Sequence, residues 1–212
     1  MAMTIDGHVA HPTDAWNYGS SEDRRRMDRL REWAQCLIVS RKTLEHDNMD
    51  LRVRTKPQAK HPRPVIVMQS PRALRQGLNA AKTAATLGEL WLSAAHPAPS
   101  VRELWSDIGE GWQLHQHNTV SDIVRSLHNR GYTKLLLEGG PSLNGLFFEH
   151  DLVDEFYLTI LPIAWGGTTT DRSIISSQPL PLQKFRLQSA ERRRDEIFLR
   201  YVRRRQTPKP RE

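Results

Sequence analysis

The sequence predicts an α/β fold: a mixed, mostly parallel sheet flanked by helices, with an antiparallel strand pair near the C-terminus. Short apolar runs at residues 36–39 and 65–68 alternate with stretches of helical periodicity, as in parallel strands joined by helices. Residues 185–191 and 196–203 alternate in polarity and lie close together, which is typical of an antiparallel hairpin. The length of 212 residues suits one domain, which we place at residues 1–205.

The first half of the chain predicts one clear helix among short strands. This helix covers residues 22–34, is capped by Ser20 or Ser21, and carries acids in its first turn, where they favour a helix N-terminus. Its apolar side chains recur at helical spacing and are expected to face the core: Met27, Leu30 and Ala34. The other elements are a strand at 2–10 bent at Asp6-Gly7, a buried strand at 36–39, a helical turn at 41–47 and a short strand at 51–54.

The second half follows the same alternation after a proline-rich connector at residues 56–64. Residues 73–87 are rich in alanine, and their pattern leaves the type of element open. A helix begins at Thr119 or Ser121 and is closed by Gly131, and another begins at Pro141. The predicted strands are 65–68, 89–94, 112–115, 135–137 and 155–164.

Composition narrows the class of protein without naming a function. The net charge of +7 suits either a nucleic-acid partner or phosphorylated small ligands, but no RNA-binding module, zinc-finger spacing or basic zipper supports the first. No apolar run is long enough to span a membrane. The single cysteine, Cys36, excludes a disulfide framework and favours a reducing cytoplasm. Residues 206–212 are polar and basic, which predicts a disordered tail.

The most informative motif is the apolar run at residues 135–137, which ends in Glu138 and is followed by Gly139, Gly140 and Pro141. Glycines allow backbone amides to approach a ligand closely, and a helix N-terminus offers unpaired donors suited to phosphate. Glu138 stands at a strand end, where open α/β sheets bind ligands. A purely structural turn between strand and helix would show the same glycines, so the motif alone leaves both interpretations open.

Several blocks together resemble the reductase domain of riboflavin biosynthesis, which in many bacteria is the C-terminal half of a bifunctional pyrimidine deaminase/reductase. These blocks are AMTIDGHVA, the stretch from SSEDRRRMDRL to DLRVR, and EGGPSLNG followed by LVDEFYLTILPIAWGG. The resemblance implies a dihydrofolate reductase-like fold and NADPH-dependent hydride transfer to the ribose carbon of a 5-phosphoribosylamino-pyrimidine, giving a ribitylamino product. The zinc ligands of the deaminase half are missing from the sequence, which implies a reductase with no metal.

The same resemblance implies the residues of the site. Glu138 is expected to hold the substrate or relay a proton, because reduction of a ribosylamine requires the sugar ring to open first. The other implied substrate contacts are Arg31, Leu51, Arg54 and Asp14, with the two arginines as a phosphate clamp. The implied cofactor contacts are Ala2, Trp16, Arg41, Lys42, Thr43, Asp47, Gly139, Gly140, Pro141, Ser142, Leu143, Asn144, Gly145 and Leu146.

Some positions depart from the family and keep alternatives open. Asp14 stands where the family often has serine, and a carboxylate there would repel a phosphate. Arg41 and Lys42 replace the usual small residues; they suit the 2′-phosphate of NADPH or are simply solvated cations. The alternatives are a reductase of another pterin, pyrimidine or carbonyl substrate, or a non-catalytic, basic RNA-binding relative. The family also implies a homodimer formed through edge strands.

Overall fold

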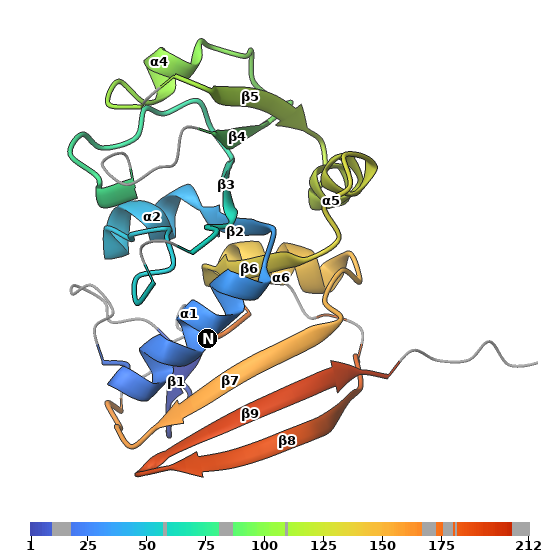
Figure 1. Ribbon diagram of the computed structural model, residues 1–212. Coiled ribbons are helices and arrows are strands. Elements are labelled where there is room, and N and C mark those ends of the chain that lie inside the picture. Colours follow the sequence, from blue (N-terminus) through green and yellow to red (C-terminus); the bar gives the residue numbers. More distant parts are fainter. Residues whose placement is uncertain are drawn as a thin grey trace, which may run out of the picture.

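The computed structural model describes residues 1–9, 18–56, 59–80, 87–108, 110–166, 173–175, 180 and 182–204. Its strands form two sheets, of five and four strands, with helix α1 (Ser21–Trp33) lying between them (Figure 1). The α/β class predicted from the sequence is confirmed, and the C-terminal hairpin is antiparallel as expected. The expected single sheet is divided into two hydrogen-bonded ladders.

The five-stranded sheet is parallel throughout and has the order β5-β4-β3-β2-β6. Its strands are β2 (Cys36–Ser40), β3 (Arg63–Met68), β4 (Gly88–Ser93), β5 (Trp112–His117) and β6 (Leu135–Gly139). Helices cover both faces, so its central strands are apolar on both sides. One face packs against α2 (Arg41–Asp47) and α4 (Val101–Leu104), the other against α5 (Val120–Asn129) and α6 (Pro141–Glu149).

The four-stranded sheet has the order β1-β7-β9-β8. Its strands are β1 (Ala2–Thr4), β7 (Glu155–Leu161), β8 (Phe185–Arg193) and β9 (Glu196–Arg203). The two sheets adjoin where β6 ends: a Cβ placed on Gly139 would lie 3.3 Å from Met1 Cε. Gly139 has φ +92°, so the chain turns away at this point and the ladder of β6 stops.

Helix α1 is confirmed, but its buried face differs from the prediction. Ser20 caps it, and the hydroxyl accepts hydrogen bonds from two first-turn amides at 3.1 Å. The most buried side chains are charged: Asp23, Asp28 and Arg31, whereas Met27 and Leu30 are only half-buried. The reason is that α1 crosses the seam between the sheets and meets polar partners there, such as Thr159 Oγ1 at 2.7 Å from Asp23.

Four further details correct the sequence prediction. Residues 51–54 form no strand, because the carbonyls of Asp50 and Arg52 accept hydrogen bonds from the Arg31 side chain instead of from a neighbouring strand. Strand β7 ends at Leu161 rather than at residue 164, and β5 continues to His117. Helix α4 was not predicted, although Ser100 and Glu103 form a capping box.

Among the described helices, none is long and apolar enough to cross a membrane.

Candidate active site

Ser40 joins two segments that the sequence predicts for cofactor binding. It ends β2 and caps α2, and its hydroxyl oxygen accepts hydrogen bonds from Thr43 N at 3.2 Å and Gly140 N at 3.3 Å. The same hydroxyl lies 3.0 Å from Thr43 Oγ1. The start of α2 and the turn before α6 therefore meet at one serine, although Ser40 and Gly140 are 100 residues apart. We call this group, Ser40, Thr43, Gly139 and Gly140, the strand-end junction.

The strand-end junction is closely packed and depends on its two glycines. A Cβ on Gly140 would collide with Thr43 Oγ1, and Gly139 has φ +92°, which disfavours any residue with a side chain. Helix α6 starts at Pro141 directly after this turn, and no side chain caps it. Gly140, the N-cap residue, has no side chain to bond the amides of the first turn, and helix N-termini that bind phosphate use such amides.

Glu138, the residue just before the junction, is held by Arg31. The two side chains form a bidentate pair, with Nε to Oε1 and Nη2 to Oε2 both at 2.7 Å. Both side chains are only 4% exposed. Arg31 Nη1 also donates to the carbonyls of Asp50 at 2.6 Å and Arg52 at 2.8 Å. This pair fixes the Glu138 carboxylate at the end of β6 and ties it to the segment after α2.

The commitment of Arg31 to Glu138 changes the predicted phosphate clamp. Burial opposes the charge of Arg31, but Glu138 outweighs it and raises the pKa of the guanidinium above its ordinary value. The group is therefore a permanent cation whose hydrogen bonds are directed at protein atoms. Arg31 and Arg54 do not form a pair of free cations side by side, because Arg54 has a separate partner, Asp28, at 3.2 Å.

The cations at the start of α2 are also unequal. Arg41 Nη1 lies 3.3 Å from Glu45 Oε2, and only 13% of the Arg41 side chain is exposed. Lys42, the next residue, is exposed. Asp47 pairs with His46 Nδ1 at 2.7 Å near the end of α2. Lys42 is thus the more accessible of the two predicted cofactor cations, while Arg41 is held against its own helix.

The remaining predicted residues fall into three groups. Leu51 is only 2% exposed and packs in the apolar core, so its side chain faces away from solvent. Asp14 and Trp16 lie outside the described residues. In α6, Ser142 is exposed, and Asn144 Nδ2 donates a hydrogen bond to Ile174 O at 2.9 Å. The other predicted residues lie in β1 or in the first two turns of α6: Ala2, Pro141, Ser142, Leu143, Asn144, Gly145 and Leu146.

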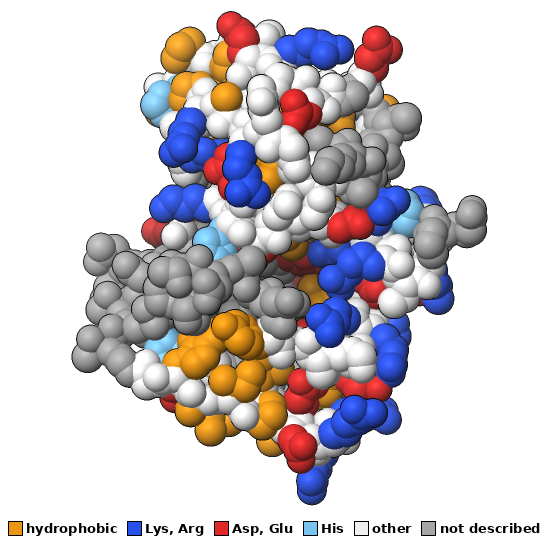
Figure 2. Space-filling model, turned by 90° about the vertical axis from the view of Figure 1, so that its left-hand side faces the viewer, with side chains coloured by type: hydrophobic (Ala, Val, Ile, Leu, Met, Phe, Trp, Pro, Cys, Tyr) orange, Lys and Arg blue, Asp and Glu red, His pale blue; other side chains and the backbone are white. Residues whose placement is uncertain are grey.

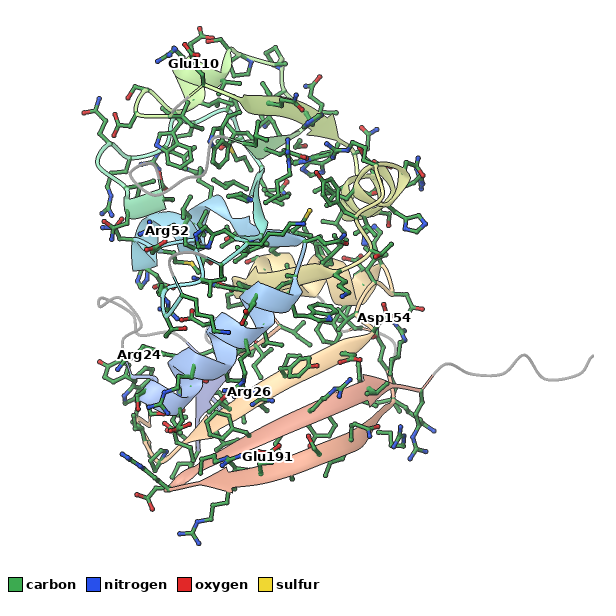
Figure 3. The ribbon with its side chains drawn as sticks, in the orientation of Figure 1. Arg24, Arg26, Arg52, Glu110, Asp154 and Glu191 are labelled. Atoms are coloured by element: carbon green, nitrogen blue, oxygen red, sulfur yellow. The ribbon has the colours of Figure 1, made fainter. Side chains whose placement is uncertain are left out.

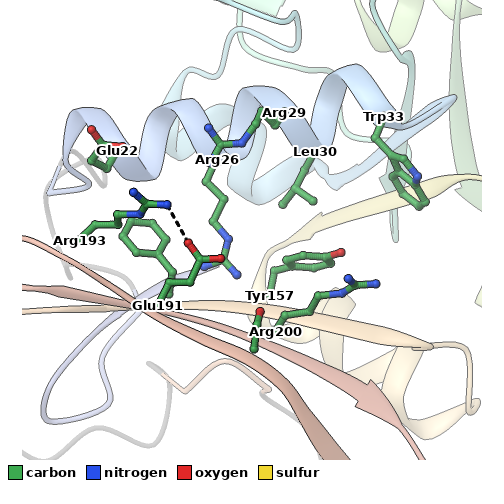
Figure 4. A pocket seen from close by; sticks show the side chains of 11 residues that line it. Glu22, Arg26, Arg29, Leu30, Trp33, Tyr157, Glu191, Arg193 and Arg200 are labelled. Carbon is green, nitrogen blue, oxygen red and sulfur yellow. Dashed lines mark hydrogen bonds and ion pairs between the residues drawn. The ribbon is translucent and has the colours of Figure 1, made fainter.

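A hollow lies away from these residues, between α1 and the four-stranded sheet (Figure 4). Its volume is about 500 Å³, and it is lined by arginines, acids and aromatic rings that include Trp33 and Tyr157. Arg26 stands between α1 and this sheet (Figure 3), where its guanidinium stacks on the rings of Tyr157 and Phe198. Among the predicted active-site residues that the structure describes, none lines this hollow.

Sequence reasoning missed two residues that organise the site. Ser40 precedes Thr43 by three residues at the end of a strand, which is the pattern of a helix cap and could have been recognised. Asp28 lies on the buried face of α1 and binds Arg54, but only a contact map reveals such a distant pair. In the part of the chain that the structure describes, no three His, Cys, Asp or Glu residues are grouped to hold a metal ion.

The fold and the strand-end junction define an α/β protein of the reductase type that the sequence resembles. The RibD C-terminal domain model matches residues 1–199, and the chain belongs to this family.

Named relatives agree with this assignment. A protein of Methanothermobacter thermautotrophicus, 29% identical over 78% of this chain and 77% of its own length, is named 2,5-diamino-6-ribosylamino-4(3H)-pyrimidinone 5′-phosphate reductase. One of Archaeoglobus fulgidus, with the same name, is 27% identical over 91% of this chain and 90% of its own. RibD of Acinetobacter baumannii has the same fold, with a TM-score of 0.78 at 20% identity over 96% of this chain. This chain spans only 56% of that RibD chain.

Proposed function

We propose that the protein catalyses the NADPH-dependent reduction of 2,5-diamino-6-ribosylamino-4(3H)-pyrimidinone 5′-phosphate to its ribitylamino product. Two relatives carry the name of this reductase. The observation in this chain that supports the proposal best is the position of Glu138 immediately before the strand-end junction, held by Arg31 at 2.7 Å. The carboxylate and the turn that we propose for the cofactor phosphates thus adjoin at one strand end, where open α/β sheets bind ligands.

The residues of the junction fit a nicotinamide dinucleotide. Bound there, NADPH would supply the hydride. The first-turn amides of α6, at Ser142 and Leu143, would donate to a phosphate, and Gly140 has no Cβ to obstruct it. Lys42 is exposed and would contact the 2′-phosphate, while Arg41 would first have to give up part of its contact with Glu45. This arrangement favours NADPH over NADH.

Glu138 would manage the protons of the reaction. Opening the ribosylamine ring removes a proton from the amine nitrogen and delivers one to the ring oxygen. The bond between the anomeric carbon and that oxygen breaks, and a double bond forms between this carbon and the nitrogen. Addition of hydride to the carbon would then require a proton from solvent at the nitrogen. A carboxylate can take the first proton and return it to the oxygen. Each oxygen of Glu138 accepts one hydrogen bond from Arg31 and keeps further acceptor capacity for the substrate. Arg54 would contact the substrate phosphate.

We also infer a homodimer in the cytoplasm. Strand β8 lies at the edge of its sheet, and Leu187 and Ile197 of the hairpin are 47% and 43% exposed, a surface that a second copy would cover. Burial raises the pKa of the Cys36 thiol to about 12, which suits an inert core cysteine in a reducing compartment. A nucleic-acid partner is not proposed, because basic side chains stand among acidic ones on the face shown in Figure 2.

The test is a turnover assay with purified protein, NADPH and the diamino substrate, following the loss of nicotinamide absorbance. We expect turnover with NADPH, slower turnover with NADH, and a ribitylamino product by mass spectrometry. The deaminated analogue, 5-amino-6-(5-phosphoribosylamino)uracil, is the comparison substrate, because it shows whether reduction precedes deamination. Absence of turnover with both pyrimidines would refute the proposed function. Gel filtration of the same sample tests the dimer.

A further inference from the structure

The segment from Asp50 to Thr55 is held in place by side chains of α1 rather than by strand pairing. Arg31 binds the carbonyls of Asp50 and Arg52, at 2.6 and 2.8 Å. One helical turn earlier, Asp28 accepts a hydrogen bond from Thr55 N at 2.9 Å. Two buried charges of one helix therefore fix the path of a segment that carries two arginines, Arg52 half-buried and Arg54 exposed.

Asp28 makes a second contact, to the side chain of Arg54. Its Oδ2 accepts the hydrogen bond from Thr55 N, and its Oδ1 accepts one from Arg54 Nε at 3.2 Å. The Asp28 side chain is 3% exposed, whereas that of Arg54 is 39% exposed. Burial opposes the charge of Asp28, but the Thr55 amide and Arg54 lower the pKa of the carboxyl below its ordinary value. A buried anion thus holds an arginine whose outer end is in solvent.

Arg52 and Arg54 are two residues apart but are paired differently. Arg52, near α2 in Figure 3, uses Nε and Nη2 together on the carboxylate of Asp50, at 3.2 and 3.1 Å. Arg54 uses only Nε on Asp28. Among the described residues, both terminal nitrogens of Arg54 are without a partner. They form the face of a guanidinium that suits two oxygens of one phosphate.

The position of Arg54 relative to Glu138 suits a ribose phosphate. Their partners, Asp28 and Arg31, are three residues apart on the buried face of α1, and such side chains are neighbours about 5–6 Å apart. Arg54 and Glu138 are thus held by two neighbouring side chains of the same helix. This common support suits a substrate whose sugar and phosphate are joined in one phosphoribosyl group.

We propose that Asp28 is a positioning residue that orients Arg54 to receive the 5′-phosphate of the substrate. Asp28 does not touch the substrate. It fixes the guanidinium of Arg54 through Nε, so that both terminal nitrogens remain available to bind the phosphate. This proposal rests on the proposed function, because it assumes a phosphorylated substrate beside Glu138. It assigns substrate recognition to a pair on α1 and the following segment, with Arg31 reserved for Glu138.

The experiment compares kinetic constants for the phosphorylated pyrimidine and for the same compound without its phosphate. The variants are Asp28→Asn, Arg54→Gln and the double variant, with Arg52→Gln as the matched control. We expect Asp28→Asn to raise KM for the phosphorylated substrate about fivefold, the scale of one ion pair, and to leave KM for the dephosphorylated one unchanged. Arg54→Gln should raise the same KM further, and the double variant should be no worse than Arg54→Gln alone.

Each outcome is decisive. An unchanged KM ratio in Asp28→Asn, with a changed one in Arg54→Gln, would overturn the role of Asp28 and leave the proposed function intact. An unchanged ratio in Arg54→Gln would overturn the phosphate assignment itself. Absence of turnover in the native protein would overturn the proposed function and this inference together. If Asp28→Asn fails to fold, Asp28→Glu keeps the charge but displaces it, and the same rise in KM is expected at smaller size.

Discussion

Around Ser40 and Gly140 the candidate site consists of backbone amides and hydroxyls, whereas beside α1 it consists of charged side chains that pair in the interior. The strand-end junction depends on close approach: Gly140 N lies 3.3 Å from Ser40 Oγ, with no space for a Cβ. We call the charged residues beside α1, which are Arg31, Glu138 and Asp28, the α1 seam. The α1 seam depends on electrostatics: Arg31 and Glu138 are both 4% exposed and bound to each other. The strand-end junction should therefore be more sensitive to a change in side-chain size than to a change in charge. The α1 seam should be more sensitive to a change in charge than to a change in size.

The largest effect is expected where the buried pair is broken. Arg31→Met leaves the Glu138 carboxylate buried without a partner, and removing one member of such a pair costs about 3–5 kcal/mol of unfolding free energy. Urea unfolding measures this loss. The double variant Arg31→Met with Glu138→Gln should recover part of it, because no unpaired charge remains. A loss below about 1 kcal/mol would show that the seam is not held by charge.

A smaller loss of stability is expected at the junction. Gly140→Ala places a methyl group against Thr43 Oγ1 and should cost about 1–3 kcal/mol, the range of overpacking. Affinity for NADPH should fall about tenfold, because the phosphate-binding turn has to shift. The control is Gly131→Ala, where φ is +87° and no atom lies within 4 Å, so only backbone strain is added. Equal NADPH affinity in the two variants would count against the junction as a cofactor site.

The sequence predicts the junction better than the seam for a physical reason. Ser40 and Thr43 are close in sequence, and so are Gly139, Gly140 and Pro141. Short sequence motifs therefore predict their local geometry. Glu138 and Arg31 are 107 residues apart, and Asp28 and Arg54 are 26 apart. Nothing in a helix pattern tells which arginine meets which acid. The same limit explains why α1 was expected to bury Met27 and Leu30.

A third and smaller effect is expected on the preference for NADPH over NADH, where Lys42 and Arg41 should differ. Lys42→Ala should reduce the preference for NADPH over NADH about fivefold, the scale of one exposed charge contact to a phosphate. Arg41→Ala should have the smaller effect, because Glu45 lies 3.3 Å from its guanidinium. The measurement is the ratio of kcat/KM for the two cofactors. A larger effect in Arg41→Ala would reverse this ranking of the two cations.

Acid is expected to act on the seam and to spare the junction, which contains no titratable side chain. The pKa of Asp28 lies below its ordinary value of 3.8, so the unfolded chain binds this proton first as the pH falls. The stability that Asp28 contributes is complete well above pH 3.8 and is lost as the pH falls through the folded-state pKa. The difference in melting temperature between the native protein and Asp28→Asn should therefore shrink below that pH. A difference that stays constant would contradict the charged pairing.

The most direct test of the whole account is a crystal structure of the protein with NADPH and the ribitylamino product. The account predicts cofactor phosphates at the first-turn amides of α6, beside Ser40 and Gly140, and the product phosphate on the terminal nitrogens of Arg54. Glu138 should remain paired with Arg31 and contact the reduced sugar chain. A cofactor bound instead in the groove lined by Arg26, Trp33 and Tyr157 would contradict the account.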